Sequence, residues 1–340
     1  MKFLRVLLIL AILLAIAYLM GPTPETPVFK KNLPAVKDTG FVLQEWVAHK
    51  EARVKLKPDN GARIVWANDS LKTKTPYVVV YLHGFSASQK EGDPAHLDFA
   101  RKYGCNLYLA RLDGHGVDTS EALLHMTATS LWESAKEAYA IGKQLGEKVI
   151  IMGTSTGGTL ALMLAATYPE IDGLVLLSPN IAINDPNAHL LNNHWGLELA
   201  RLVKKSHYIQ PMDKRPEALQ YWSAPYRLEA AVQVEELLED KMTPETFAAV
   251  KQPVLMLYYF KDETHQDPVV KVSAMKEMFA DLGTPADKKR AVAIPEAGDH
   301  VIGSSLKSRD VASVEKEIDR FAEGVLGLSV RPAPVRDSLP

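Results

Sequence analysis

The chain has 340 residues, 47% of them hydrophobic, and a formal net charge of −2. This length can bury a large core, and the near-neutral charge lacks the basic excess of nucleic-acid-binding domains, so we expect no nucleic-acid partner. Cys105 is the only cysteine, which excludes an internal disulfide and a cysteine metal cluster.

The first 20 residues are typical of a targeting segment. Lys2 and Arg5 precede an apolar run that ends at Met20. The run is short for a spanning helix of about 20 residues and lies at the upper limit for the apolar part of a signal peptide. An uncleaved signal anchor is favoured, because Tyr18 and Leu19 fit poorly behind a cleavage site, and a cleaved signal peptide stays open. We therefore expect a cell-envelope protein with its positive charges on the cytoplasmic side, either membrane-anchored with an exported catalytic domain or secreted or periplasmic after cleavage.

Composition changes mark the expected domain boundaries. Residues 21–50 carry several prolines and few large apolar residues, which predicts an extended lead-in. The globular domain is expected over residues 51–326 and a disordered tail over residues 327–340. The first three strands are predicted over residues 62–67, 77–82 and 106–110.

The strand over residues 77–82 ends in His83-Gly84-Phe85. A turn of this kind can aim a backbone N–H group at a neighbouring site, so we expect Phe85 to supply one donor of an oxyanion hole. His83 precedes the turn and is expected to brace the loop.

Residues 149–169 combine a buried strand, the motif Gly153-Thr154-Ser155-Thr156-Gly157 and a helix that ends before Pro169. A G-x-S-x-G motif between a strand and a helix predicts a nucleophile elbow with Ser155 at its tip. The backbone N–H of Thr156 is then the second expected oxyanion donor.

Three motifs in this order carry a family resemblance: YLHGF at residues 81–85, RLDGHG at 111–116 and GTSTGG at 153–158. Over roughly residues 75–325 the chain resembles α/β-hydrolases of the serine aminopeptidase, monoglyceride lipase and carboxylesterase group. The resemblance implies an α/β fold, the α/β-hydrolase fold, with a mostly parallel central sheet flanked by helices and a helical lid insertion. It also implies a structural role for His115 near the nucleophile.

The expected lid covers about residues 181–250. Its rings either line a substrate pocket or pack the lid onto the body. They are Trp195, Tyr208, Tyr221, Trp222 and Tyr226. Lys204 and Lys205 are typical of a solvated face, with an anionic lipid surface as the alternative.

The loop after the strand over residues 253–259 holds two candidate catalytic acids. Asp267 precedes Pro268, a pattern typical of the N-cap of the next helix. This favours Asp262, with which the acid of the family pattern aligns, and Asp267 stays open. A metal site that combines both aspartates with His265 and Asp299 matches no known ligand spacing, so no metal is expected.

The last strand, over residues 291–294, is followed by Gly298-Asp299-His300. His300 is the expected catalytic histidine because it follows the final strand. The order Ser155, Asp262, His300 is the α/β-hydrolase order.

The predicted triad indicates a serine hydrolase that cleaves small-molecule or lipid esters through an acyl-enzyme, as a carboxylesterase or monoacylglycerol lipase does, without a cofactor. A serine aminopeptidase or amidase on the same triad stays open, and it would need a lid carboxylate for the substrate's amino terminus. The candidates are Asp185, Glu198, Glu235, Glu236 and Glu239. A catalytically silent hydrolase fold used for binding is a third alternative. The oligomeric state is not predicted.

Overall fold

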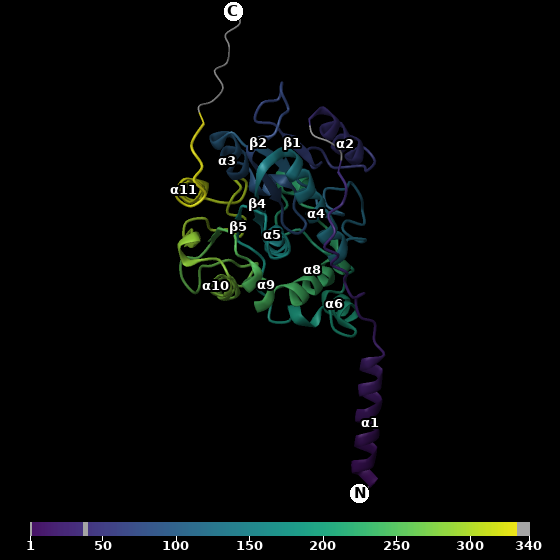
Figure 1. Ribbon diagram of the computed structural model, residues 1–340. Coiled ribbons are helices and arrows are strands. Elements are labelled where there is room, and N and C mark those ends of the chain that lie inside the picture. Colours follow the sequence, from purple (N-terminus) through teal and green to yellow (C-terminus); the bar gives the residue numbers. More distant parts are fainter. Residues whose placement is uncertain (1, 37–39, 332–340) are drawn as a thin grey trace, which may run out of the picture.

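The central feature of the computed structural model, which describes residues 2–36 and 40–331, is a seven-stranded sheet (Figure 1). Its order is β1-β3-β2-β4-β5-β8-β9. The pair β1–β3 is antiparallel and the other neighbouring pairs are parallel. The strands are β1 (Arg63–Val65), β2 (Thr75–Leu82), β3 (Asn106–Leu109), β4 (Gly146–Thr154), β5 (Gly173–Leu177), β8 (Val254–Tyr258) and β9 (Lys289–Ala293).

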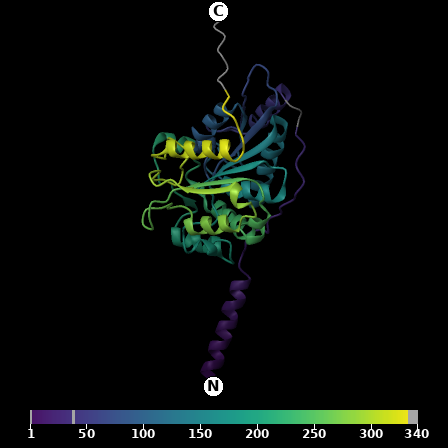
Figure 2. The same ribbon diagram turned by 60° about the vertical axis from the view of Figure 1, so that its left-hand side comes forward.

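Helices cover both faces of this sheet, because its central strands are apolar on both sides. Residues that alternate along a strand belong to different cores: Val78 and Val80 face one core, and Val79 and Tyr81 the other. The second core is closed by α3 (Ala95–Tyr103) and α11 (Val311–Gly324), and Figure 2 shows α11 lying across that face. The first core is closed mainly by α4 (Ala128–Leu145), α5 (Thr156–Thr167), α8 (Leu228–Lys241), α9 (Pro244–Ala249) and α10 (Val272–Asp281). The predicted parallel sheet flanked by helices is confirmed.

The predicted lead-in is more structured than its prolines suggest. Residues 41–51 form α2 (Phe41–Glu51), whose Leu43 and Val47 are buried in the first core. Before it, the indole of Trp132 donates to the carbonyl of Lys30 at 2.8 Å. The lead-in is therefore part of the folded body.

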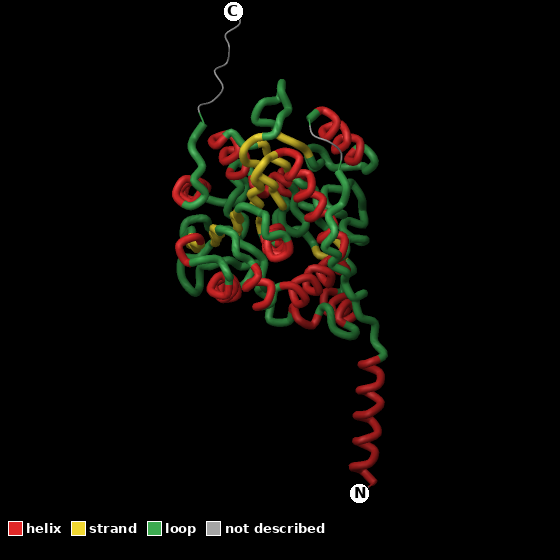
Figure 3. Tube along the Cα trace, in the orientation of Figure 1, coloured by secondary structure: helices red, strands yellow, loops and turns green. Residues whose placement is uncertain are grey.

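The insertion between β5 and β8, residues 181–250, is called the cap below. It contains η2 (Ala188–Leu190), α6 (Gly196–Lys204), α7 (Pro216–Tyr221), α8 and α9, as predicted for a mainly helical segment. Strands β6 (Tyr208–Ile209) and β7 (Tyr226–Arg227) form a small antiparallel pair that was not predicted, because two-residue strands leave no periodicity in a sequence. In Figure 3 the cap helices gather at one end of the sheet.

The two ends of the described chain differ in packing. Among the described helices, α1 (Lys2–Leu19) is the one long and apolar enough to cross a membrane, with a mean hydropathy of 2.4 and no buried residue. It projects from the body beside α6 (Figure 1). Of the predicted disordered tail, residues 327–331 are ordered and Leu328 is buried, while residues 332–340 lie outside the described part.

Two short 3₁₀ helices complete the described elements, η1 (Gln89–Gly92) after β2 and η3 (Ala286–Lys288) before β9. Helix α4 begins with a capping box in which Thr127 is the N-cap residue and Ser130 is its reciprocal partner.

Candidate active site

Ser155 sits on a sharp turn between β4 and α5. Its φ of 52° and ψ of −120° are a backbone conformation that side chains rarely adopt, at a cost of about 1–3 kcal/mol. The Ser155 N–H donates to Leu177 O at 3.0 Å, and its carbonyl accepts from Gly158 N at 2.8 Å and Asn180 N at 3.0 Å. These bonds hold the strained turn that the G-x-S-x-G motif predicts.

Two glycines make the turn sterically possible. A Cβ at Gly157 would lie 2.0 Å from the carbonyl oxygen of Leu82, and a Cβ at Gly153 would lie 2.4 Å from the carbonyl oxygen of Gly157. The start of α5 therefore packs directly against the end of β2, which brings Ser155 next to the His83-Gly84-Phe85 turn.

Two neutral histidines brace that turn. The His83 ring donates from Nδ1 to Gly84 O at 2.9 Å and accepts at Nε2 from Leu112 N at 3.1 Å. The His115 ring accepts at Nε2 from Ser86 N at 3.0 Å. Burial lowers the pKa of both rings, to about 4 for His115, so neither carries charge near neutral pH. The bracing role predicted for His83 is confirmed, and His115 has the structural role that the resemblance implied.

The two predicted oxyanion donors lie on either side of the contact between the end of β2 and the start of α5. Phe85 follows Gly84 after β2, and Thr156 is the first residue of α5. Within the described residues, neither backbone N–H donates to a protein acceptor. Both groups are thus available to an oxygen of a substrate.

Glu91 is a buried carboxylate beside the elbow that the sequence did not reveal. Its Oε2 accepts from the Gly84 N–H at 2.5 Å. A Cβ built on Gly84 would lie 2.9 Å from both Glu91 oxygens and from Ser155 Cβ, so these groups are contiguous. Burial raises the pKa of Glu91 to about 7, against the opposing effect of the Gly84 bond. A single glutamate among polar loop residues gives no sequence signal of burial.

His300 pairs with Asp267. Its Nδ1 lies 2.7 Å from Asp267 Oδ2, and the two residues are 7% and 1% exposed. Burial lowers the pKa of His300, but the carboxylates of Asp267, Glu91 and Asp299 outweigh it and raise the pKa above its usual value. The pair therefore favours a proton on the imidazole.

The prediction that Asp262 is the partner of His300 is wrong. Asp262 is exposed, and its Oδ1 accepts from Thr264 N at 2.9 Å and Thr264 Oγ1 at 2.7 Å. These bonds and the His265 ring hold the pKa of Asp262 well below its usual value.

The physical reason lies in where the next helix begins. Helix α10 starts at Val272 with Lys271 as its N-cap, four residues later than Asp267. Asp267 instead forms a turn in which Oδ1 accepts from Val269 N at 2.9 Å and Val270 N at 3.1 Å. Its Oδ2 stays free for His300.

The loop after β9, which carries His300, is hydrogen-bonded to the segment after β2, which carries Glu91. Ser304 Oγ donates to Lys90 O at 2.9 Å, and Ser305 N donates to Asp93 O at 3.1 Å. These bonds hold the His300 loop against the segment of Glu91, whose carboxylate adjoins Ser155 at Gly84. The carboxyl ends of the strands are where ligands bind in open α/β sheets.

The cap covers the turn after β2. Ser223 N donates to Ser86 O at 2.6 Å, and the Tyr226 and Phe85 rings meet edge-on with centroids 4.9 Å apart. The Tyr221 hydroxyl instead donates to Asp59 at 3.0 Å, and the Trp195 indole donates to Ala17 O at 3.0 Å. Of these rings, Tyr226 is the one that contacts the predicted oxyanion loop.

Most of the predicted cap carboxylates bond to neighbouring residues of the cap. Glu198 pairs with Arg201, and Glu236 and Glu239 accept from Asn192. Glu235 is buried with Oε2 lacking a partner among the described residues, and burial raises its pKa to about 7. No hydrogen bond or ion pair in the described chain joins any predicted cap carboxylate to the elbow.

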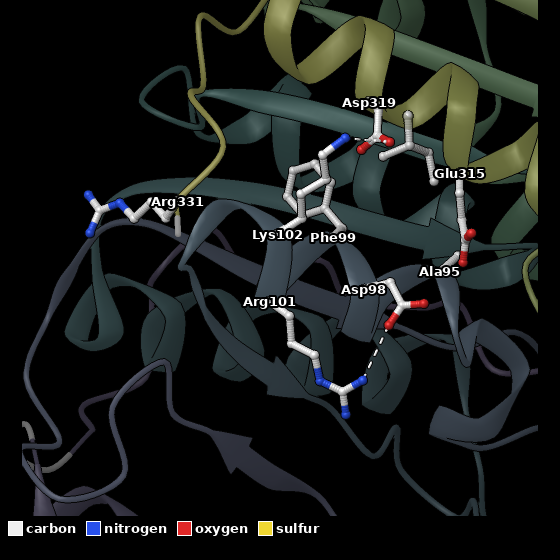
Figure 4. Close-up of a pocket in the computed structure, with 9 residues that line it drawn as sticks. Ala95, Asp98, Phe99, Arg101, Lys102, Glu315, Asp319 and Arg331 are labelled. Atoms are coloured by element: carbon white, nitrogen blue, oxygen red, sulfur yellow. Dashed lines mark hydrogen bonds and ion pairs between the residues drawn. The ribbon is translucent and has the colours of Figure 1, made fainter. Parts of the chain in front are cut away.

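A hollow of about 390 Å³ lies between α3 and α11 and contains none of the predicted site residues (Figure 4). Its charged side chains pair with one another, as Lys102 with Asp319 at 2.8 Å and Arg101 with Asp98 at 3.2 Å. We do not assign it to the active site.

Comparison with known proteins agrees with this geometry. Residues 79–313 match the alpha/beta hydrolase family. A thermostable monoacylglycerol lipase of Bacillus sp. (strain H-257) is 34% identical over 112 residues, which span 33% of this chain and 43% of that protein. The match thus covers less than half of this relative.

Two solved structures share the fold at low sequence identity. One, from a study of the metagenome-derived lipolytic enzymes LipS and LipT, has a TM-score of 0.62 at 17% identity and covers 79% of this chain and 100% of its own. The other, a monoacylglycerol lipase of Paleococcus ferrophilus, has a TM-score of 0.56 at 17% identity and covers 79% of this chain and 98% of its own.

Proposed function

Because the chain belongs to the alpha/beta hydrolase family, we propose that it is a serine hydrolase that cleaves carboxylic esters through an acyl-enzyme. The observation that supports this proposal is the buried pair of His300 and Asp267, with Nδ1 and Oδ2 2.7 Å apart, whose His300 loop is bonded to the segment of Glu91 beside the strained Ser155 turn. No cofactor enters the proposed chemistry.

In the proposed mechanism His300 Nε2 accepts the hydroxyl proton as Ser155 Oγ attacks the ester carbon. Asp267 accepts from Nδ1–H, holds the ring in that tautomer and stabilises the imidazolium. The N–H groups of Phe85 and Thr156 bind the oxyanion. The imidazolium gives its proton to the leaving alcohol, and a water molecule then releases the acid by the same steps.

We propose a lipid or other apolar ester, such as a monoacylglycerol, as the substrate class. Support comes from the partial similarity to a monoacylglycerol lipase and from the apolar Phe85–Tyr226 contact between the cap and the predicted oxyanion loop. A serine aminopeptidase or amidase gains no support from the cap, whose predicted carboxylates form no hydrogen bond or ion pair with the elbow in the described chain.

We also propose that α1 is an uncleaved membrane anchor. It is 18 residues long with a mean hydropathy of 2.4 and no buried residue, and Lys2 and Arg5 lie in its N-terminal turn. These charges favour a cytoplasmic N-terminus, with the catalytic domain on the exported side of the membrane.

The test is labelling with a fluorophosphonate probe together with hydrolysis of a p-nitrophenyl ester. We expect the wild type to be labelled and active, and Ser155→Ala to lose both. Ser178→Ala is the matched control, because Ser178 is buried and its hydroxyl lacks a partner among the described residues. Undiminished turnover by Ser155→Ala, or an unlabelled wild type, contradicts the proposal.

A panel of substrates separates esterase from amidase. We expect kcat/KM to be much higher for long-chain monoacylglycerols than for aminoacyl anilides. A preference for the anilides would favour the aminopeptidase alternative instead.

A further inference from the structure

The end of α1 is fastened to the cap rather than projecting freely from it. Trp195, the N-cap of α6, donates from its indole to Ala17 O at 3.0 Å and from its backbone to Pro22 O at 3.0 Å. The Tyr18 ring meets the His194 ring edge-on with centroids 5.3 Å apart. The start of α6 therefore lies at the level of the last turn of α1.

For an α1 that crosses a bilayer, this level is that of the membrane surface. A helix of 18 residues is about 27 Å long, close to the roughly 30 Å of a hydrocarbon core. No length is left over, so residues at its end, with Tyr18 and Trp195, would lie in the interfacial layer that aromatic side chains favour.

The face of α6 turned away from the body is apolar. Leu199, Leu202 and Val203 follow helical spacing and are 50%, 72% and 78% exposed. The opposite side packs on another helix of the cap, where Arg201 pairs with Glu229 on α8 at 2.7 Å. A row of exposed leucine and valine side chains on a short helix is costly in water.

Basic residues follow this apolar row. Lys204 and Lys205, at the end of the helix, are exposed, and Met212, which follows β6, is 95% exposed. Apolar side chains bordered by lysines are the pattern of helices that lie in the interface of an anionic bilayer.

We propose that α6 is a membrane-docking helix: the exposed face of Leu199, Leu202 and Val203 lies in the surface of the bilayer that α1 crosses. The cap that covers the turn at Phe85 is then in direct contact with lipid, so that a lipid substrate enters from the bilayer. This inference rests on the proposed anchor.

The test places a solvent-sensitive nitrobenzoxadiazole label on single cysteines of the full chain in vesicles of phosphatidylcholine and phosphatidylglycerol. Cys105 is buried and burial raises its pKa to about 12, so the wild type serves as the unlabelled blank. The positions are Leu202→Cys on α6, Leu10→Cys on α1 and, as control, Ala312→Cys on the exposed side of α11. Doxyl-labelled lipids quench only labels in the bilayer.

We expect emission at positions 202 and 10 to shift to shorter wavelength and to be quenched, and emission at 312 to do neither. Quenching at 10 without quenching at 202 overturns the inference and leaves the anchor intact. Absence of quenching at both positions overturns the inference together with the anchor. Equal quenching at 202 and 312 also overturns it, since the whole body would then adhere without a preferred face.

A double variant gives an independent functional readout. Leu202→Glu with Val203→Glu places two charges on the docking face and touches no proposed catalytic residue. We expect hydrolysis of a soluble short-chain ester to be unchanged and hydrolysis of a monoacylglycerol in the same vesicles to fall several-fold. Equal activity on the vesicle substrate in the variant and the wild type contradicts the docking role.

Discussion

His300 Nδ1 and Asp267 Oδ2 lie 2.7 Å apart in a part of the molecule where both side chains are almost fully buried. The second oxygen of Asp267 is held by the N–H groups of Val269 and Val270. One carboxylate thus fixes both its own loop and the imidazole, which orients the ring before any substrate binds.

Asp267→Asn should therefore impair catalysis more than folding. The amide oxygen of this variant can still accept the turn bonds, but its NH₂ group would force the wrong tautomer on His300, and a loss of about 10⁴ in kcat is typical of this change. Ester hydrolysis at mildly alkaline pH measures the effect, with thermal unfolding as the check on folding.

Asp262→Asn is the matched control on the same loop. Asp262 is exposed and bonds only within its own turn. We therefore expect the activity of the Asp262→Asn variant to stay within about twofold of the wild type. A larger loss in Asp262→Asn than in Asp267→Asn would reverse the assignment of the acid.

Glu91→Gln should change the pH dependence of the reaction. Only neutral His300 accepts the Ser155 proton, so the acid limb of kcat/KM reports the pKa of His300. Burial lowers that pKa, and Asp267 and Glu91 raise it to a net value above the usual one. Glutamine can still accept from Gly84 N but has no charge, so the pKa falls and the acid limb moves to lower pH.

The measurement is kcat/KM across a pH range of about 4 to 9. Glu296→Gln is the control, because Glu296 lies on the same loop as His300 but is exposed and paired with Lys261 at 3.0 Å. Its profile should match the wild type. An acid limb that stays in place or moves upward in Glu91→Gln would show that Glu91 does not act on His300 electrostatically.

The secondary structure around the elbow was predictable from short-range pattern. Continuous apolar runs such as residues 149–152 identified the buried strands, and the helix before Pro169 ends at Thr167 as expected. Helix α2 was not found, because its two buried residues, Leu43 and Val47, are too few to show a period beside the prolines.

The parts of the site that could not be predicted from the sequence were missed for a different reason. Ser155 and His300 stand at strand ends in motifs that local sequence reveals, whereas the choice between Asp262 and Asp267 depended on where α10 begins. That start, at Val272, is fixed by tertiary contacts of the loop such as the bond from Asn184 N to Val269 O. Glu91 is buried by residues distant in the chain, which no local pattern encodes.

Gly157→Ala should destabilise the protein strongly. Its Cβ would lie 2.0 Å from Leu82 O and 2.8 Å from His83 O, and backbone atoms cannot move aside as a flexible side chain can. We expect a loss of about 3 kcal/mol, the upper part of the range for overpacking. Denaturant unfolding measures it.

Gly324→Ala is the corresponding control. A Cβ at Gly324 meets nothing within 4 Å at the end of α11, and alanine favours helix by up to about 1 kcal/mol over glycine. Equal stability of the two variants would contradict close packing of α5 on β2.

The packed lead-in predicts where the chain can be shortened. Val28 N donates to Thr129 Oγ1 at 2.8 Å, the Tyr168 hydroxyl donates to Lys31 O at 2.7 Å, and Phe29 and Leu33 pack on the first core. A chain that starts at residue 24 keeps these contacts, and one that starts at residue 40 loses them. Since a fully buried large apolar side chain contributes about 1.5–3 kcal/mol and these are partly buried, the shorter chain should be less stable by at least about 2 kcal/mol. Urea unfolding of both chains measures the difference, and coincident midpoints would mean that residues 24–39 only connect the body to α1.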